Sequence, residues 1–140
     1  EYLSQIDKDL HRTFPGHPCM DLGGRAALRR ILSAYGQRNP AVGYCQGLNF
    51  LGATFLLLLP EEEAFWCLAA LVEDLLGTAY FDERMAAPQV DVLVYGHLLQ
   101  GRFPTLWRHL AALEVDAASV TLHWFLLCFL NSLPLDSALR

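Results

Sequence analysis

The sequence predicts an all-α fold, an irregular domain of several helices without a β-sheet. Apolar residues recur at the three- and four-residue spacing of a helix in almost every segment, and no pair of segments alternates like neighbouring strands. Proline and glycine stand between these segments, where helices begin and end. Because 54% of the residues are hydrophobic and only 18% are charged, burial can offset the entropy of ordering the chain.

Two helices are predicted before residue 40. The first ends before Pro15, and Asp21 is expected to cap the second, which ends near Gly36. The apolar positions expected in the core are Leu3, Ile6 and Leu10 in the first helix and Leu22, Leu28 and Leu32 in the second.

Two further helices are predicted between residues 44 and 77. Asn39-Pro40 and Gly43 predict a turn, and the third helix follows at roughly 44–59. Pro60 and the glutamates after it predict the start of the fourth, since proline fits the first turn and carboxylates suit the positive end of the helix dipole. Gly77 is expected to end it.

The second half of the chain predicts four more helices. They begin near Pro88, at Pro104, near residue 118 and at Pro134, and the one at 118–132 is apolar on every side, which is typical of a helix at the centre of a larger assembly. Since the chain stops within the last helix, we expect residues 1–140 to form one helical domain that is part of a longer unit.

The composition excludes several classes of function. A net charge of −5 disfavours a general nucleic-acid binder. The four cysteines form no C-x-x-C pair, which indicates a reducing, intracellular compartment and no zinc site. The longest predominantly apolar run, Phe50–Leu59, is about half the length of a membrane-spanning helix.

Asp9 and Arg12 form the first polar feature that needs an explanation. They are three residues apart on the first predicted helix, acid first, a spacing and order that favour an ion pair. Such a pair would hold the arginine at the rim of the core, where Ile6 is buried. The alternative is an ordinary surface pair worth a few tenths of a kcal/mol.

Gln46 is the second polar feature that needs an explanation. Gly43 and Gly47 flank it and leave the backbone open to close approach, and Tyr44 could fix the glutamine or contact a partner. The alternative is that Gln46 caps the third helix or bonds within its first turn. An arginine and a glutamine together are the groups that phosphoryl transfer from GTP uses, because one neutralises charge on the γ-phosphate and the other orients water.

At these residues the sequence resembles the TBC domain, the Rab GTPase-activating module. That family is recognised by I-x-x-D-x-x-R and Y-x-Q, which read here as IDKDLHR (6–12) and YCQ (44–46). The resemblance implies Arg12 as an arginine finger and Gln46 as a glutamine finger, with Asp9 orienting Arg12, Tyr44 holding the Gln46 segment and Ile6 anchoring the helix.

The resemblance also implies the partner and the cofactors. A GTP-bound Rab would carry the GTP and Mg²⁺, and this chain would have no cofactor of its own. The expected location is the cytoplasm, with membrane contact only through the Rab. A catalytically inactive Rab-binding scaffold remains the alternative.

Two departures from the family pattern stand out. Leu48 replaces a common methionine, and the family normally continues past Arg140 with further helices, so the C-terminal third is expected to be missing.

Other candidate sites are weaker. His11, His17 and Cys19 match no zinc spacing, and Cys45 has no evident histidine partner for nucleophilic catalysis. No G-x-x-x-x-G-K-[ST] motif is present, so the chain is not expected to bind GTP itself.

Overall fold

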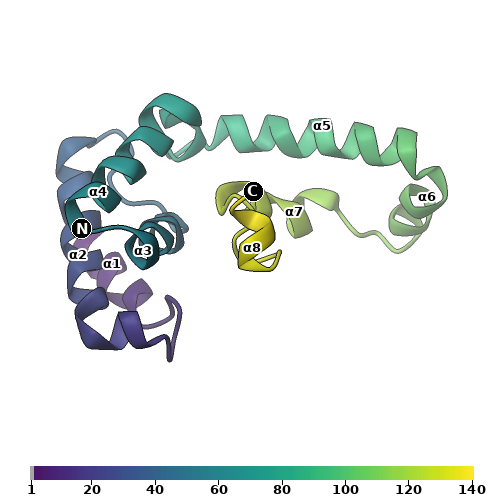
Figure 1. The fold of residues 1–140 in the computed structure, drawn as a ribbon. Helices are drawn as coiled ribbons and strands as arrows, with labels where there is room; N and C mark the ends of the chain where they lie inside the picture. Colours follow the sequence, from purple (N-terminus) through teal and green to yellow (C-terminus); the bar gives the residue numbers. More distant parts are fainter. Residues whose placement is uncertain (1) are drawn as a thin grey trace. The chain divides into compact units, whose positions relative to one another are not determined.

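The computed structural model describes residues 2–140, and across them the chain forms helices joined by turns, with no strand (Figure 1). The prediction of an all-α fold is confirmed. The chain divides into two compact units, Glu1–Arg84 and Met85–Arg140, which are described separately below.

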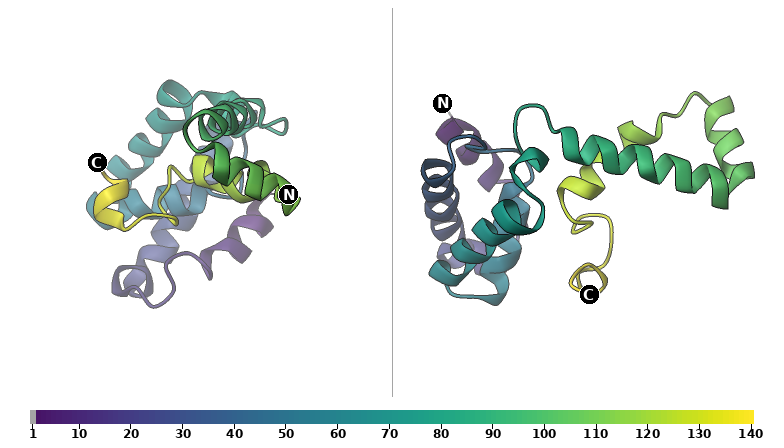
Figure 2. Two further views of the ribbon diagram at one scale, coloured as in Figure 1. Left: turned by 90° about the vertical axis from the view of Figure 1, so that its right-hand side faces the viewer. Right: turned by 90° about the horizontal axis from the view of Figure 1, so that it is seen from above.

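The first unit contains four α-helices, and the second of them lies at its centre. The helix α2 contacts α1, α3 and α4, as the grouped ribbons of Figures 1 and 2 show. The elements of this unit are α1 (Tyr2–Leu10), η1 (Met20–Gly24), α2 (Arg25–Arg38), α3 (Leu48–Leu58), α4 (Glu61–Ala70), η2 (Leu71–Leu75) and η3 (Thr78–Tyr80).

Aliphatic side chains from these helices form the core of the first unit. The fully buried ones include Ile6, Leu28, Leu32, Leu48, Leu68 and Val72. Gly52 on α3 allows α2 and α3 to approach closely, because a Cβ at this position would lie 3.1 Å from Cδ1 of Leu28.

Three arginines of α2 connect this helix to its neighbours at the surface. Arg29 pairs with Asp7 of α1 at 2.6 Å, Arg30 pairs with Glu61 of α4 at 2.6 Å, and Arg38 pairs with Glu73 of η2 at 2.9 Å. Each pair is open to solvent, so water and salt weaken it and it contributes little to stability. These pairs orient the helices more than they stabilise the unit.

The start of the second helix differs from the prediction. Asp21 does not cap it: residues Met20–Gly24 form a π-type turn in which Gly23 has φ 110°, and Asp21 pairs with Arg25 at 2.7 Å. This turn directs Leu22 into solvent, where 88% of it is exposed, so its predicted place in the core is wrong. Leu3 is also exposed, although Ile6 and Leu10 of the same stripe are buried.

The third helix begins at Leu48, four residues later than predicted, because Gly47 before it has φ 112°, outside helical geometry. Residues 44–46 therefore lie in a loop. The fourth helix begins directly after Pro60 as predicted, but α4 gives way at Leu71 to the π-type turn η2 before Gly77.

The second unit contains α5 (Ala86–Arg102), α6 (Pro104–Ala112), α7 (Ala117–Leu126) and α8 (Leu135–Ala138). The helix α5 contacts both α6 and α7, and Tyr95 of α5 packs edge-on against Trp124 and Phe125 of α7. The predicted start at Pro104 is confirmed. The helix α7 ends at Leu126, short of the predicted 132, because Cys128 and Phe129 have positive φ.

No helix among residues 2–140 combines the length and the apolar character needed to cross a bilayer. The apolar segment 118–132 was predicted to lie at the centre of a larger assembly. Within the second unit most side chains of this segment are only half-buried or exposed.

The core assignment predicts different effects for two leucines. Leu28→Ala removes a fully buried side chain and is expected to lower the free energy of unfolding by about 2–5 kcal/mol. Leu22→Ala, the matched control at an exposed position, should change it by less than about 0.5 kcal/mol. Chemical denaturation of both variants measures the difference, and equal losses would contradict the observed burial.

Candidate functional site

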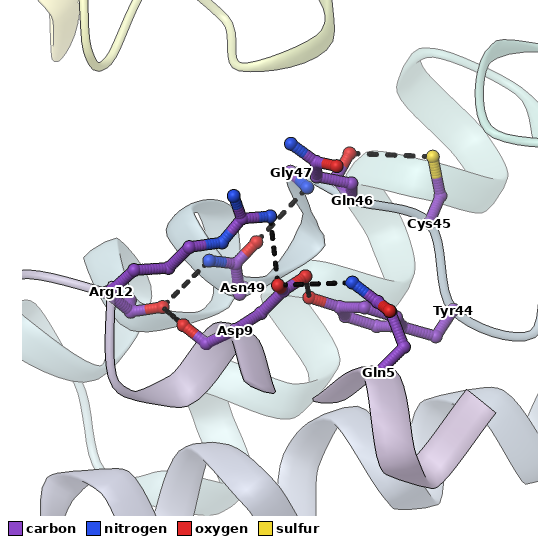
Figure 3. Close-up of polar contacts among 9 residues, drawn as sticks. Gln5, Asp9, Arg12, Tyr44, Cys45, Gln46, Gly47 and Asn49 are labelled. Carbon is purple, nitrogen blue, oxygen red and sulfur yellow. Dashed lines mark hydrogen bonds and ion pairs between the residues drawn. The ribbon is translucent and has the colours of Figure 1, made fainter. Parts of the chain in front are cut away.

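The carboxylate of Asp9 is the centre of the candidate site (Figure 3). The residue is only 2% exposed, near the end of α1. Its Oδ1 pairs with Nη2 of Arg12 at 2.9 Å and accepts a hydrogen bond from Nε2 of Gln5 at 3.3 Å. Its Oδ2 accepts a hydrogen bond from the Tyr44 hydroxyl at 2.7 Å. Both carboxylate oxygens are therefore satisfied.

These partners explain how a charge can lie inside the fold. A buried carboxylate is costly unless a cation and hydrogen bonds compensate it. Arg12 supplies the cation, while Tyr44 and Gln5 supply neutral donors. The Arg12 side chain stays 48% exposed, so its guanidinium is held at one side and open on another.

The backbone around Arg12 is fixed as well. The helix α1 ends at Leu10, so Arg12 lies in the turn that follows it and not on the helix as predicted. The carbonyl oxygen of Asp9 accepts hydrogen bonds from the Arg12 amide at 3.2 Å and from Oγ1 of Thr13 at 2.7 Å. This turn projects Arg12 from a defined point.

Gln46 lies in the loop before α3 and is exposed. Gln46 does not cap α3, because the N-cap position is occupied by Gly47 and no side chain bonds the first turn of the helix there. Figure 3 shows the side chains of Gln46 and Arg12 on the same side of the hydrogen-bonded residues, although they come from different segments. Both predicted finger residues are exposed.

Asn49 and Thr13 connect the two segments. Nδ2 of Asn49 donates to Oγ1 of Thr13 at 2.7 Å, and Oδ1 of Asn49 accepts from the Gly47 amide at 3.1 Å. Both side chains are fully buried. Neither residue was predicted as part of the site.

Two ionisable groups in the loop have shifted pKa values. Burial, with the neighbouring Asp9 carboxylate as a second cause, raises the pKa of the Tyr44 hydroxyl, which stays protonated and can donate its hydrogen bond. Burial also raises the pKa of the Cys45 thiol, which disfavours the reactive thiolate. Cys45 is therefore a poor nucleophile.

The other residues singled out in the sequence are either buried in the core or exposed at the surface. Ile6 is fully buried in α1, on the helix that carries Asp9. His11, His17 and Cys19 are exposed, and within residues 2–140 no three His, Cys, Asp or Glu side chains gather closely enough to hold a metal ion.

This arrangement can supply a cation from Arg12 and an amide from Gln46, while both oxygens of the nearby Asp9 carboxylate are already bonded and Cys45 is a poor nucleophile. Arg12 can neutralise developing negative charge, and Gln46 can both donate and accept hydrogen bonds.

Gln5 was not predicted as part of the site, although its spacing from Asp9 could have predicted the contact between them. It is four residues before Asp9, a spacing at which side chains on a helix meet. Thr13 and Asn49 are 36 residues apart in the chain, and no local spacing could have paired them.

Comparison with known proteins places the whole chain in one group. The family model of the Rab-GTPase-TBC domain matches residues 1–140. TBC1 domain family member 2A of Rattus norvegicus is 45% identical over 140 residues, covering 97% of this chain and 15% of the relative. Small G protein signaling modulator 3 of Homo sapiens is 40% identical over 139 residues, covering 97% and 19%.

Two solved structures have a similar fold. The flagellar RabGAP TBC domain of Chlamydomonas matches with a TM-score of 0.87 at 35% identity, over 100% of this chain and 47% of that one. The Ypt/Rab-GAP domain of Gyp1p matches with a TM-score of 0.80 at 21% identity, over 99% and 52%, and supports the fold alone. The chain thus spans less than a fifth of each of these curated relatives and about half of each solved chain.

The environment of Tyr44 predicts an alkaline titration that Tyr44→Phe should change. The pKa of Tyr44 lies above its ordinary value of 10.0 in the folded state, so the unfolded state releases this proton first as the pH rises. The stability that Tyr44 contributes is complete below pH 10 and is lost above it. Tyrosinate absorbance should show a smaller late-ionising fraction in Tyr44→Phe than in the unaltered protein.

Titration in guanidinium chloride provides the control, because unfolding should bring the tyrosines of both proteins to one ordinary pKa. Tyr35, whose pKa burial also raises, should remain in the late fraction of both folded proteins. A late fraction of equal size in the two folded proteins would contradict the raised pKa of Tyr44 and with it the buried position of its hydroxyl beside Asp9.

Proposed function

The chain belongs to the Rab-GTPase-TBC domain family, and from this premise we propose that it activates GTP hydrolysis by a Rab-family small GTPase. In this proposal Arg12 and Gln46 enter the nucleotide site of the partner. The observation that supports it best is the pair itself: both side chains are exposed on one side of a buried polar network centred on Asp9.

Arg12 would stabilise the negative charge that develops on the transferred phosphoryl group. Its guanidinium carries five N–H donors, and the ion pair with Asp9 uses Nη2. The remaining donors can face phosphate oxygens while the Asp9 contact keeps the planar group oriented. Holding the arginine before the partner arrives lowers the entropy lost on binding.

Gln46 would orient the attacking water. Its amide can accept a hydrogen bond from this water and donate another to the phosphoryl oxygens, without acting as a base. Gly43 and Gly47, with φ of 58° and 112°, give the backbone on either side of Gln46 conformations that side chains rarely adopt, and Gln46 itself is exposed.

The partner would hold GTP and Mg²⁺, since the chain has no phosphate-binding motif of its own. The residues described here would neutralise charge and position water, and the Rab would provide the remaining contacts. Membrane association would follow from the Rab, which places the site of action at the cytoplasmic side of endomembranes.

Single-turnover hydrolysis by a panel of GTP-loaded Rabs tests the proposal. The full-length protein should accelerate at least one Rab. Arg12→Ala should remove about 10³–10⁵-fold of rate, the effect of an arginine finger. Gln46→Ala should cost about 10²-fold, as does loss of one transition-state hydrogen-bond donor.

Two variants serve as matched controls. Arg29→Ala removes another half-exposed arginine that pairs with an aspartate of α1, and Gln37→Ala removes another exposed glutamine. Both should keep the acceleration, with folding of all variants checked by circular dichroism. If a Rab binds but none is accelerated, the proposed activity is wrong and the chain is a Rab-binding scaffold.

A further inference from the structure

Two buried polar residues, Thr13 and Asn49, are not part of either finger motif. Each follows a finger residue closely: Thr13 is the next residue after Arg12, and Asn49 bonds the amide of Gly47, the next residue after Gln46. Both side chains are fully buried, and 2.7 Å separates Oγ1 of Thr13 from Nδ2 of Asn49.

The hydrogen bonds of Thr13 and Asn49 determine which group donates and which accepts in each of them. The Asn49 amide must donate through Nδ2 to Thr13, because its Oδ1 faces the N–H of Gly47. A flipped amide would place two donors against each other. With Asn49 as its donor, the Thr13 hydroxyl donates its own hydrogen to the Asp9 carbonyl at 2.7 Å. One arrangement of donors satisfies every group.

From this geometry we propose that Thr13 and Asn49 are positioning residues that couple the Arg12 segment to the Gln46 segment. The inference rests on the proposed function, because it concerns how the two fingers reach one nucleotide together. The chain of contacts runs from the Asp9 carbonyl through Thr13 and Asn49 to Gly47, so neither finger segment can shift without breaking a buried hydrogen bond.

Such coupling matters because two groups must act on one phosphoryl group at fixed separation. A displacement of about 1 Å at a reacting centre can cost about 10²-fold in rate. Arg12 and Gln46 are exposed and lie on a turn and a loop, elements that move readily. The buried pair gives the turn and the loop a common anchor.

A purely structural role would predict only a loss of stability, and α3 offers a control that separates the two roles. Thr54 is also buried, and its hydroxyl donates to the carbonyl oxygen of Phe50 at 2.8 Å within α3. Thr54→Val and Thr13→Val make the same chemical change at buried sites. Only Thr13→Val breaks the connection between the finger segments.

The first experiment measures saturating rate and half-saturating concentration in single-turnover hydrolysis, with the full-length protein and an accelerated Rab. Thr13→Val and Asn49→Ala should lower the saturating rate by about 10–100-fold, with the half-saturating concentration changed by less than about threefold. Thr13→Ser keeps the hydroxyl and should restore most of the rate. Thr54→Val should match the unaltered protein.

Amide hydrogen exchange at Gly47 supplies a readout independent of GTP hydrolysis. Asn49→Ala removes the acceptor of this amide directly, whereas Thr13→Val reaches it only through Asn49. Both should accelerate exchange at Gly47 by about tenfold or more, and Thr54→Val should not. If Thr13→Val does not fold, the exchange rates of Asn49→Ala and Thr54→Val at Gly47 still test the coupling.

Different results overturn the two proposals. If the unaltered protein accelerates no Rab, the proposed function is wrong and the catalytic part of this inference is lost with it. If it accelerates a Rab and folded Thr13→Val or Asn49→Ala keeps the full saturating rate, only the coupling is wrong. Unchanged exchange at Gly47 in these variants also overturns the coupling.

Discussion

A buried carboxylate organises the first half of this molecule. Asp9 lies inside the fold with both oxygens bonded, and its partners come from α1, from the turn after it and from the loop before α3. Breaking a buried ion pair by removing one partner typically costs about 3–5 kcal/mol, since the other charge stays buried. The charge therefore connects three segments of the chain through polar contacts.

The loop before α3 makes this arrangement possible. A helix starting at residue 44 would have bonded the backbone of Tyr44 and Gln46 into its first turn. The positive φ of Gly47 delays the helix to Leu48, so Tyr44 can turn its hydroxyl inward to Asp9 while Gln46 remains exposed. Gly47 thus keeps both residues in a loop, where Tyr44 bonds Asp9 and Gln46 faces outward.

Sequence reasoning succeeded where the physical cause is local. Pro60 precedes one helix and Pro104 begins another, because proline fits the start of a helix, and the predicted pair of Asp9 with Arg12 forms although Arg12 lies in the turn after α1. It failed where the cause is the path of the backbone, as at Leu22, or a tertiary contact. Asn49 reads as an ordinary helix residue, and only the fold brings it to Thr13.

Similar ion pairs have different consequences in this chain because their burial differs. Arg29 and Asp7 are both half-exposed, so water competes with the pair and salt screens it. In the pair of Arg12 with Asp9 only the cation reaches solvent, and the buried carboxylate has no water to replace its partner. The attraction is therefore stronger at Arg12 than at Arg29, although the two arginine side chains are almost equally exposed, at 48% and 49%. The buried carboxylate keeps this exposed guanidinium in one orientation, as the proposed arginine finger requires.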